Sequence, residues 1–551
     1  MKKDLLWLTL VFGALCFFVL GRAALDPKDE GRYAEIPREM VAAHEYVTPR
    51  LDGITYFEKP PLMYWAEIAS TRAFGSGEFA VRVPEAAMCL LGILVTYLAG
   101  RALGGRLVGL AAAAVLGTAA VLSVFSHILT LDLAVAVWIS STLFCFILGI
   151  REAPGPRRRW LFYGLYLSSA LATLTKGPIG FLLTGAVMLL WLLLCGQWKR
   201  LLPIYLPTGA LMFLLVAAPW HLLAARRNPT WAHFYFIHEN WERFTTTVHN
   251  RRGAWWYFIP EIFPGLFPWL GCLFPAVTNA LRGGWAQRKA NADRWFCVIW
   301  AAAIFLFFSK SQSKLPGYIL PVFPALAVII GQWLNDIWTA PDAVKRARWA
   351  FGIFSGFSVL LGVGAIVAVT IPGKFKIDPE QAAGLQHPAW ALAAVLFCGA
   401  FAVERSRRKG EFHPALGAMA LTGALMLAVA DTAAPDLWKP GTKLLARTVL
   451  VRGVPQARVF HYHEFFHDFL YYSRGFVDTV DFVGELEPDN DPAVPPGRLA
   501  DTAEFRRAWA SDQQVYAVAR KKDAAALLAD PTFHYHLLNQ TRDHYLLSNR
   551  P

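Results

Sequence analysis

The chain has 551 residues, of which 55% are hydrophobic and only 17% are charged. A soluble protein of this length carries more charge, so the composition excludes an ordinary soluble enzyme and indicates a membrane protein with many spans. The net charge of +13 is not evidence for nucleic-acid binding, because the basic residues gather in short loops between apolar stretches.

Apolar stretches of about 20 residues, the length that crosses roughly 30 Å of hydrocarbon, recur as far as residue 432. They predict an α-helical polytopic domain over residues 1–432 with about 13 transmembrane helices. The expected spans lie near 4–25, 83–100, 105–125, 131–150, 160–175, 177–196, 203–224, 256–280, 295–308, 317–337, 349–371, 388–403 and 414–432. The first is longer than the apolar part of a signal peptide, so we interpret it as an uncleaved anchor. All seven cysteines lie inside these stretches, which excludes a disulfide framework.

The loops between the spans alternate in charge. The basic loops fall on one side of the count, and they are 151–159, 196–200, 282–294, 344–348 and 404–410. The positive-inside rule assigns that side to the cytoplasm. The outer side then receives the first loop, 26–82, the loops 225–255 and 309–316, and everything after about residue 433. These outer segments carry acids, histidines, aromatics and prolines, so we expect the functional site there.

The last part of the chain, residues 433–551, has a lower density of apolar residues. β-branched and aromatic residues cluster at 457–463 and 513–522, which is typical of strands. Short helices are predicted at 501–511 and 522–530. We therefore expect a small C-terminal α/β domain on the outer face.

The first outer loop begins with "DPKDEGRYAEIPREM", in which Asp29 and Glu30 lie soon after the first span. An ionisable group at a membrane boundary is costly unless it is paired or functional. The segment predicts a short helix in the membrane interface, kinked by Pro37. The charged residues expected to face water or headgroups are Arg32, Glu35, Arg38 and Glu39. The alternative is that these charges only solvate a loop.

The same loop continues into "YFEKPPLMYW", residues 56–65. Two consecutive prolines exclude the middle of a regular helix. They predict a kink that ends the loop and fixes Lys59 at the membrane surface, where a lipid phosphate lies. The alternative for Lys59 is an ion pair with an acid of the same loop.

Further ionisable and aromatic residues are predicted at the outer ends of later spans. Cations among aromatic residues at this level fit an anionic headgroup on a lipid tail. The candidates are Asp132, Lys176, His238, Arg243, His249, Lys314 and Tyr318.

Four motifs resemble a known family: "DEGRYAEIPREM", "YVTPRLDGITYFEKPPLMYW", "ERFTT" and "SKLPGYILP". They are similar to the 4-amino-4-deoxy-L-arabinose lipid A transferases, within the wider dolichyl-phosphate-mannose-protein mannosyltransferase-like group. The resemblance implies a GT-C glycosyltransferase that moves aminoarabinose from undecaprenyl phosphate to a phosphate of lipid A. It implies a bacterial inner-membrane protein with a periplasmic active site that gives resistance to polymyxin and cationic antimicrobial peptides. We expect it to act as a monomer.

A polyprenyl phosphate is a good leaving group, so the site needs cations rather than a general acid. The expected substrate-binding residues are Lys59, Arg243, Lys314, Tyr318 and Lys176. The expected catalytic carboxylates are Asp29 first, then Asp132 and Glu30. A lipid A phosphate is already largely ionised, so Asp29 could serve as a base, orient the acceptor or hold the ammonium group of the sugar.

Glu58 with His238 or His249 could bind a divalent cation such as zinc, because imidazole and carboxylate groups suit that metal. Plain hydrogen bonding is the alternative, since the spacing matches no dedicated zinc motif.

Three other functions remain open from the sequence. A transporter or flippase for a lipid-linked sugar would show broken helices with polar groups at mid-membrane. A non-catalytic outer-face binding protein would leave the membrane-edge acids and bases unexplained. A related transferase would use another polyprenyl-phosphate sugar or a protein hydroxyl acceptor.

Overall fold

The computed structural model describes residues 1–242, 253–375, 377–437, 441–482, 484 and 498–551. The chain forms two compact units, and each is described by itself. The first unit comprises Met1–Leu20, Arg82–His221 and His238–Leu437. The second unit comprises Gly21–Val81, Leu222–Ile237 and Trp438–Pro551, so it joins the first outer loop to the C-terminal part of the chain.

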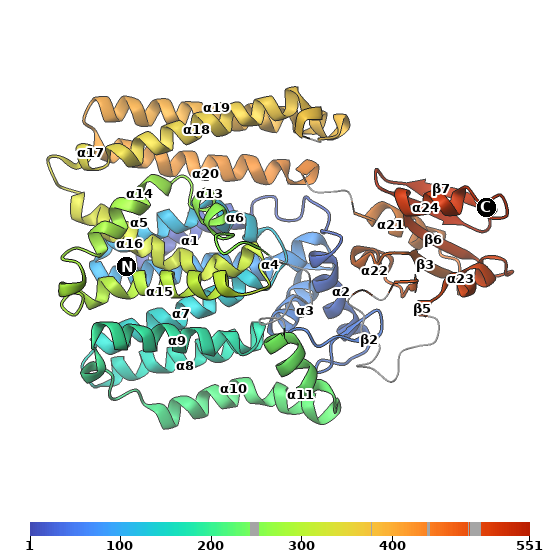
Figure 1. Ribbon diagram of the computed structural model, residues 1–551, viewed down its shortest axis with the longest axis horizontal. Helices are drawn as coiled ribbons and strands as arrows, with labels where there is room; N and C mark the ends of the chain where they lie inside the picture. The colour runs from blue at the N-terminus through green and yellow to red at the C-terminus, as the bar shows by residue number, and fades with distance from the viewer. Residues whose placement is uncertain (243–252, 376, 438–440, 483, 485–497) are drawn as a thin grey trace. The chain divides into compact units, whose positions relative to one another are not determined.

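The first unit is helical in its described residues (Figure 1). Its helices up to residue 227 are α1 (Lys2–Phe17), α4 (Glu78–Gly104), α5 (Arg106–Gly117), α6 (Ala120–Ser126), α7 (Asp132–Arg151), α8 (Pro156–Lys176), α9 (Ile179–Cys195), η1 (Trp198–Arg200) and α10 (Leu206–Arg227). The later ones are α13 (Ile259–Gly265), α14 (Leu270–Ala280), η3 (Trp285–Gln287), α15 (Ala292–Lys310), η4 (Pro316–Val322), α16 (Phe323–Ile337), α17 (Ala343–Arg346), α18 (Arg348–Thr370), η5 (Pro372–Phe375), α19 (Pro379–Arg408) and α20 (Phe412–Leu437). Among the last three long helices, α19 packs against both α18 and α20.

Within the described residues, eight helices are long and apolar enough to cross a membrane, judged by length and composition. The number rises to ten if each of two bent pairs is one span: α5 with α6, bent by 62°, and α13 with α14, bent by 107°. Each of the thirteen expected stretches contains a helix, but α1 has only 16 residues and α9 only 17. The prediction of a multi-pass helical membrane protein is confirmed, and the number thirteen stays a prediction.

The core of the first unit lies around α7 and α16, whose apolar windows are 83% and 94% buried. The segment from η4 through α16 packs against α5, α14 and α15. Gly331 permits the close crossing of α16 and α5, since a Cβ there would lie 2.8 Å from the carbonyl oxygen of Val108. Apolar side chains on every face explain why these two helices are central.

The second unit combines short helices with a six-stranded sheet in the order β5-β4-β3-β6-β8-β7. Strands β5, β4, β3 and β6 are parallel to one another, β8 pairs antiparallel with β6, and β7 pairs antiparallel with β8. The strands are β3 (Arg458–Tyr462), β4 (Asp478–Val480), β5 (Leu499–Ala500), β6 (Val515–Arg520), β7 (His536–Gln540) and β8 (His544–Ser548), and a separate hairpin is formed by β1 (Arg50–Leu51) and β2 (Ile54–Thr55). The helices are α2 (Asp29–Ala42), α3 (Leu62–Phe74), α11 (Trp231–His233), η2 (Phe234–Glu242, which continues into the first unit), α21 (Lys443–Arg452), α22 (His467–Ser473), α23 (Thr502–Trp509) and α24 (Lys521–Leu528). The predicted strands and short helices of the C-terminal α/β part are confirmed as β3, β6, α23 and α24.

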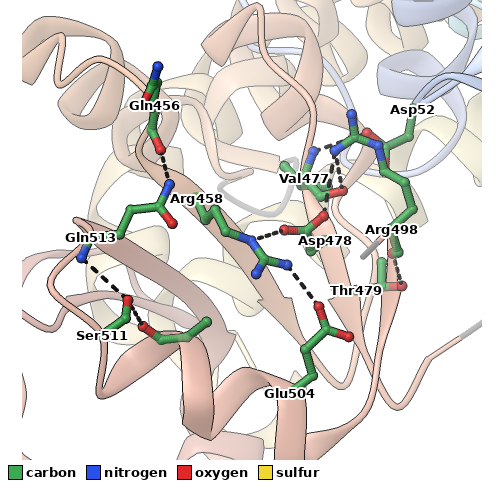
Figure 2. Close-up of polar contacts among 11 residues, drawn as sticks. Asp52, Gln456, Arg458, Val477, Asp478, Thr479, Arg498, Glu504, Ser511 and Gln513 are labelled. Atoms are coloured by element: carbon green, nitrogen blue, oxygen red, sulfur yellow. Dashed lines mark hydrogen bonds and ion pairs between the residues drawn. The ribbon is translucent and has the colours of Figure 1, made fainter. Parts of the chain in front are cut away.

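The first outer loop is bound to this sheet through the turn between β1 and β2. Asp52 in that turn is fully buried, and its carboxylate accepts a hydrogen bond of 3.0 Å from the backbone N–H of Val477, just before β4 (Figure 2). Arg458 of β3 pairs with Asp478 of β4 at 3.0 Å and with Glu504 of α23 at 3.1 Å. Burial raises the pKa of the Asp52 carboxyl well above its usual range. The loop is therefore part of a folded unit and not a free connection.

Helix α2 is confirmed, with Pro37 inside it, but one prediction for it is wrong. Arg32, Glu35 and Glu39 do not face water or headgroups, because they are buried, and Arg38 is only partly exposed. The reason is that α2 packs against both α3 and α22 of its own unit. Gly31 marks the closest approach, since a Cβ there would lie 2.3 Å from the backbone nitrogen of Asp468.

The buried charges of α2 are paired. Arg38 donates two hydrogen bonds of 2.6 Å to the carboxylate of Glu35. Glu39 accepts from the backbone N–H groups of Asp52 and Gly53 at 2.6 and 2.9 Å. Burial raises the pKa of Glu39, which these donors offset in part. The charged residues that the sequence assigned to a water-facing side of α2 are therefore paired, and Glu39 holds the β1–β2 turn against the helix.

Candidate active site

In the second unit, the site is built on the first turn of α2. Asp29 is the first residue of the helix, and Arg32 follows one turn later on the same face. Arg32 Nη2 donates to Asp29 Oδ1 at 2.7 Å. The Arg32 side chain is buried, whereas 56% of the Asp29 side chain is exposed. Asp29 is thus held by a fixed cation while its carboxylate faces outward, which suits a group that contacts substrate.

Arg32 also connects α2 to the proline-rich segment. Its Nη1 donates to Tyr56 Oη at 2.9 Å and lies 4.0 Å from Glu58 Oε2. Glu58 Oε2 in turn lies 3.6 Å from the ammonium group of Lys59. Asp29, Arg32, Glu58 and Lys59 therefore form a row of alternating charges, which we call the outer-loop charge row. The ion pair that was the alternative for Lys59 is present, with Glu58 as its partner.

The prolines act as the sequence predicts. Helix α3 begins at Leu62, directly after Pro60 and Pro61. Lys59 therefore lies at the end of the loop, with a buried side chain whose ammonium also donates to the Glu58 carbonyl at 2.8 Å. A cation fixed in this way can hold a phosphate with little loss of side-chain freedom.

Glu30 has a different environment from its neighbour. It is buried, and its Oε2 accepts a hydrogen bond of 2.8 Å from the backbone N–H of Asp26. This contact closes the turn before α2 and satisfies a donor at the helix start. Its expected catalytic role stays a prediction, and the contact gives it a positioning role.

In the first unit, three predicted residues from distant parts of the chain lie together. Asp132 begins α7, Lys176 ends α8, and Tyr318 lies in η4. Lys176 Nζ pairs with Asp132 Oδ1 and lies 4.6 Å from the centroid of the Tyr318 ring. An ammonium group over an aromatic face is attracted by the ring, so Tyr318 and Asp132 together fix Lys176.

Gly317 lets η4 lie against Asp132. A Cβ at this position would lie 2.6 Å from Asp132 Cβ and Cγ, so any other residue would push η4 away. Lys314, four residues before Tyr318, is buried and donates through Nζ to the carbonyl of Ser311. The cation that lies over the Tyr318 ring is therefore Lys176, whereas Lys314 is hydrogen-bonded to Ser311 of its own loop.

Two residues of these clusters were not found from the sequence. Arg32 was assigned to the water-facing side of a helix that is in fact buried. Glu85 of α4 was missed within an apolar span, although a lone carboxylate there is itself a signal. Glu85 is fully buried, neither of its oxygens has a hydrogen-bond partner among the described residues, and the charges of Asp132 and Lys176 act on it.

The predicted metal site at Glu58 stays a prediction. Among the described residues, no group of three or more His, Cys, Asp or Glu side chains is arranged to hold a metal ion. The two cations that flank Glu58 compete with a metal for its carboxylate. Arg243, His249 and the side chain of His238 lie outside the described part of the chain.

Comparison with known proteins decides the family. A family model of dolichyl-phosphate-mannose-protein mannosyltransferases matches residues 27–263. An undecaprenyl phosphate-α-4-amino-4-deoxy-L-arabinose arabinosyl transferase of Edwardsiella ictaluri is 30% identical over 409 residues, which cover 72% of each chain. A second such transferase, of Proteus mirabilis, is 32% identical over 398 residues, covering 72% of this chain and 70% of the relative. The chain belongs to this arabinosyl transferase family.

The solved structure of ArnT from Cupriavidus metallidurans bound to undecaprenyl phosphate is similar over the whole molecule. It has a TM-score of 0.85 and 28% sequence identity, and the match covers 100% of this chain and 98% of that one. The apo structure of the same protein gives a TM-score of 0.84. The protein is therefore a GT-C glycosyltransferase, as the motifs implied. Its membership of this arabinosyl transferase family gives no support to the alternatives of a transporter or a binding protein.

Proposed function

We propose that this enzyme transfers 4-amino-4-deoxy-L-arabinose from undecaprenyl phosphate to a phosphate of lipid A, acting as a monomer at the periplasmic face of the bacterial inner membrane. The observation that carries the proposal is the similarity over the whole chain to a structure that binds undecaprenyl phosphate. The relatives named for this sugar support the choice of donor. The added sugar would reduce the negative charge of lipid A and so weaken the binding of polymyxin and other cationic peptides.

The chemistry follows from the charges of the site. The bond between the anomeric carbon and the undecaprenyl phosphate oxygen breaks, and the phosphate leaves with the electron pair. An oxygen of the acceptor phosphate forms the new bond to that carbon. Cations that face the departing phosphate stabilise the charge that develops on it. The sequence assigns this role to Lys59 of the second unit, and to Arg243 and Lys314 with Tyr318 of the first unit.

Asp29 and Asp132 have different tasks in this scheme. We assign to the exposed carboxylate of Asp29 the role of orienting the acceptor or of holding the ammonium group of the sugar. A base is barely needed, because a phosphate acceptor is largely ionised at neutral pH. Asp132 forms an ion pair with Lys176, so we assign to it the role of holding that lysine toward the substrate.

The test is the lipid A of cells that carry Asp29→Asn. The substitution removes the charge with little change in shape, so the protein should fold while transfer is abolished. Mass spectrometry of lipid A should show the added sugar with the parent gene and not with the variant or without the gene. Asp512→Asn, at an exposed position of the C-terminal part, is the matched control and should leave the modification intact. Normal modification by Asp29→Asn would remove this residue from the catalytic site.

We also propose that Glu58 binds a divalent cation, such as zinc, together with His238 or His249. The support is chemical, since carboxylate and imidazole are suitable zinc ligands. Metal analysis of the purified protein should then give about one zinc per chain, and Glu58→Gln should lose it. An equal metal content in parent and variant would contradict the proposal.

A further inference from the structure

A second polar site lies in the first unit, at the end away from Asp132, Lys176 and Tyr318. It is a cavity of about 280 Å³ lined by the last residues of α4 and α16, the first residues of α5 and α15, Arg200 of η1 and the loop that follows η3. Tyr318 and Asp336 lie near opposite ends of the continuous segment from Pro316 to Ile337. This segment has 22 residues, so the two sites are separated by roughly 30 Å.

The lining of this cavity has one more cation than it has acids. Arg200, Lys289 and Arg294 all contribute to it. Lys289 has no ion pair among the described residues and is exposed. An anion that enters the cavity therefore meets a lysine whose charge no carboxylate of the described chain compensates.

The two acids of the cavity are already engaged. Asp293 is shared by Arg200 and Arg151, each at 3.2 Å. Asp336 accepts from Arg294 and from the side-chain amide of Asn279, each at 2.9 Å. Each carboxylate is thus compensated by a guanidinium or amide donor, and the remaining positive charge favours an anionic ligand.

One buried group of the lining has an unsatisfied hydrogen-bond acceptor. Gln332 lines the cavity and is only 8% exposed, yet its Oε1 has no hydrogen-bond partner among the described residues. A buried carbonyl oxygen without a donor is costly. A phosphate diester has no hydroxyl to donate to it, whereas a free hydroxyl group elsewhere on the ligand would satisfy it.

The surroundings place this cavity at the level of lipid headgroups. Trp198 of η1 and Trp285 of η3 are both exposed, and these short helices adjoin the lining cations Arg200 and Lys289. Exposed tryptophans beside basic residues at helix ends are typical of a membrane–water interface. Basic pockets between membrane helices on the basic side of a protein are known to hold anionic headgroups.

We propose that this cavity binds the headgroup of an anionic phospholipid that carries free hydroxyls, of the phosphatidylglycerol class. The phosphate diester would contact Lys289, Arg200 and Arg294, and a glycerol hydroxyl would donate to Gln332 Oε1. The site is distinct from the donor and acceptor sites, and it does not depend on the transfer reaction. Its occupant would link the ends of α4, α15 and α16 and so stabilise the helical unit.

The experiment uses the full chain purified in detergent and titrated with short-chain phosphatidylglycerol, with binding read by native mass spectrometry and by thermal unfolding. Phosphatidylcholine with the same chains tests the charge, and glycerol 3-phosphate tests whether the lipid tails matter. We expect phosphatidylglycerol to bind at least tenfold more tightly than either and to raise the unfolding temperature. Equal binding of the two lipids, or equal binding of glycerol 3-phosphate, would overturn the proposal.

Variants separate the cavity from general surface charge. Lys289→Glu should lower the affinity for phosphatidylglycerol at least tenfold, and Gln332→Leu should lower it while leaving phosphatidylcholine binding unchanged. Lys199→Glu makes the same charge change at an exposed neighbour outside the cavity and is the control. An equal loss in the Lys199 and Lys289 variants would mean attraction to the surface alone, and the proposal would fail.

Discussion

At the scale of single residues, Lys59 shows how the loop prepares a cation for phosphate. It is buried beside Glu58, at the end of a segment closed by two prolines. Lys59→Ala should therefore weaken binding of undecaprenyl phosphate by roughly 10- to 150-fold, the equivalent of about 1.5–3 kcal/mol for one charge-assisted contact. The measurement is a binding titration with undecaprenyl phosphate, and the exposed Lys522→Ala is the control. Unchanged binding by Lys59→Ala would place the phosphate clamp elsewhere.

The residues that the sequence identified are those whose chemistry conflicts with their position. Asp29, Lys59, Asp132 and Lys176 are ionisable groups at the ends of apolar segments, and such groups need a partner or a function. Arg32 could not be assigned this way, because its burial depends on α22, more than 400 residues later in the chain. Sequence periodicity records which residues share a face of a helix, but not what covers that face.

At the scale of helices, the packing of α4 on α7 explains the place of Glu85. Gly92 of α4 approaches Val137 of α7, where a Cβ would lie 2.9 Å from the valine Cγ2. Glu85 lies about two turns earlier on the same face of α4, toward the start of α7. The buried carboxyl group of Glu85 therefore faces the Asp132–Lys176 pair from a second helix, which makes Glu85 a positioning residue for Lys176.

Glu85→Gln keeps the shape of the side chain and replaces the carboxyl group by an amide. We expect the transfer rate to fall about tenfold, which corresponds to about 1.4 kcal/mol in the barrier, because Lys176 loses one of the carboxyl groups that face it. Donor affinity should change little, so kcat should fall and KM should stay. Glu411→Gln, at an exposed site of the same unit, is the control. A raised KM with an unchanged kcat would show that Glu85 does not act through the reacting centre.

The helices themselves were easier to predict than the bends and packing between them. Runs such as the one that forms α7 are apolar for the length of a span, so their existence follows from composition. Strands β3 and β6 were found because β-branched and aromatic residues gather there, whereas β5 has only two residues and offers no such signal. The bends between α5 and α6 and between α13 and α14 were not found, because both halves are apolar and read as one span.

At the scale of the whole chain, the alternation of basic loops predicts which ends of the helices face the cytoplasm. Loops 151–159, 196–200 and 282–294 carry the excess of lysine and arginine, and they adjoin the ends of α7, α9 and α14. The ends with Asp132, Lys176 and Tyr318 carry few basic residues by comparison. The positive-inside rule therefore predicts that these residues, and the reaction, lie at the outer face.

A reporter enzyme fused after residue 433 tests this orientation. The fusion point lies at the end of the apolar span Phe412–Ala433 within α20, the last helix that qualifies as a span among the described residues. Alkaline phosphatase, which is active only outside the cytoplasm, should be active there, because the alternation of the loops puts this end of α20 on the side opposite to the basic loops. A fusion within loop 282–294 is the matched control and should be inactive. If the fusion within loop 282–294 were active and the fusion after residue 433 inactive, the predicted topology would be inverted. Asp29, Lys59 and Asp132 would then face the wrong compartment for a periplasmic transfer.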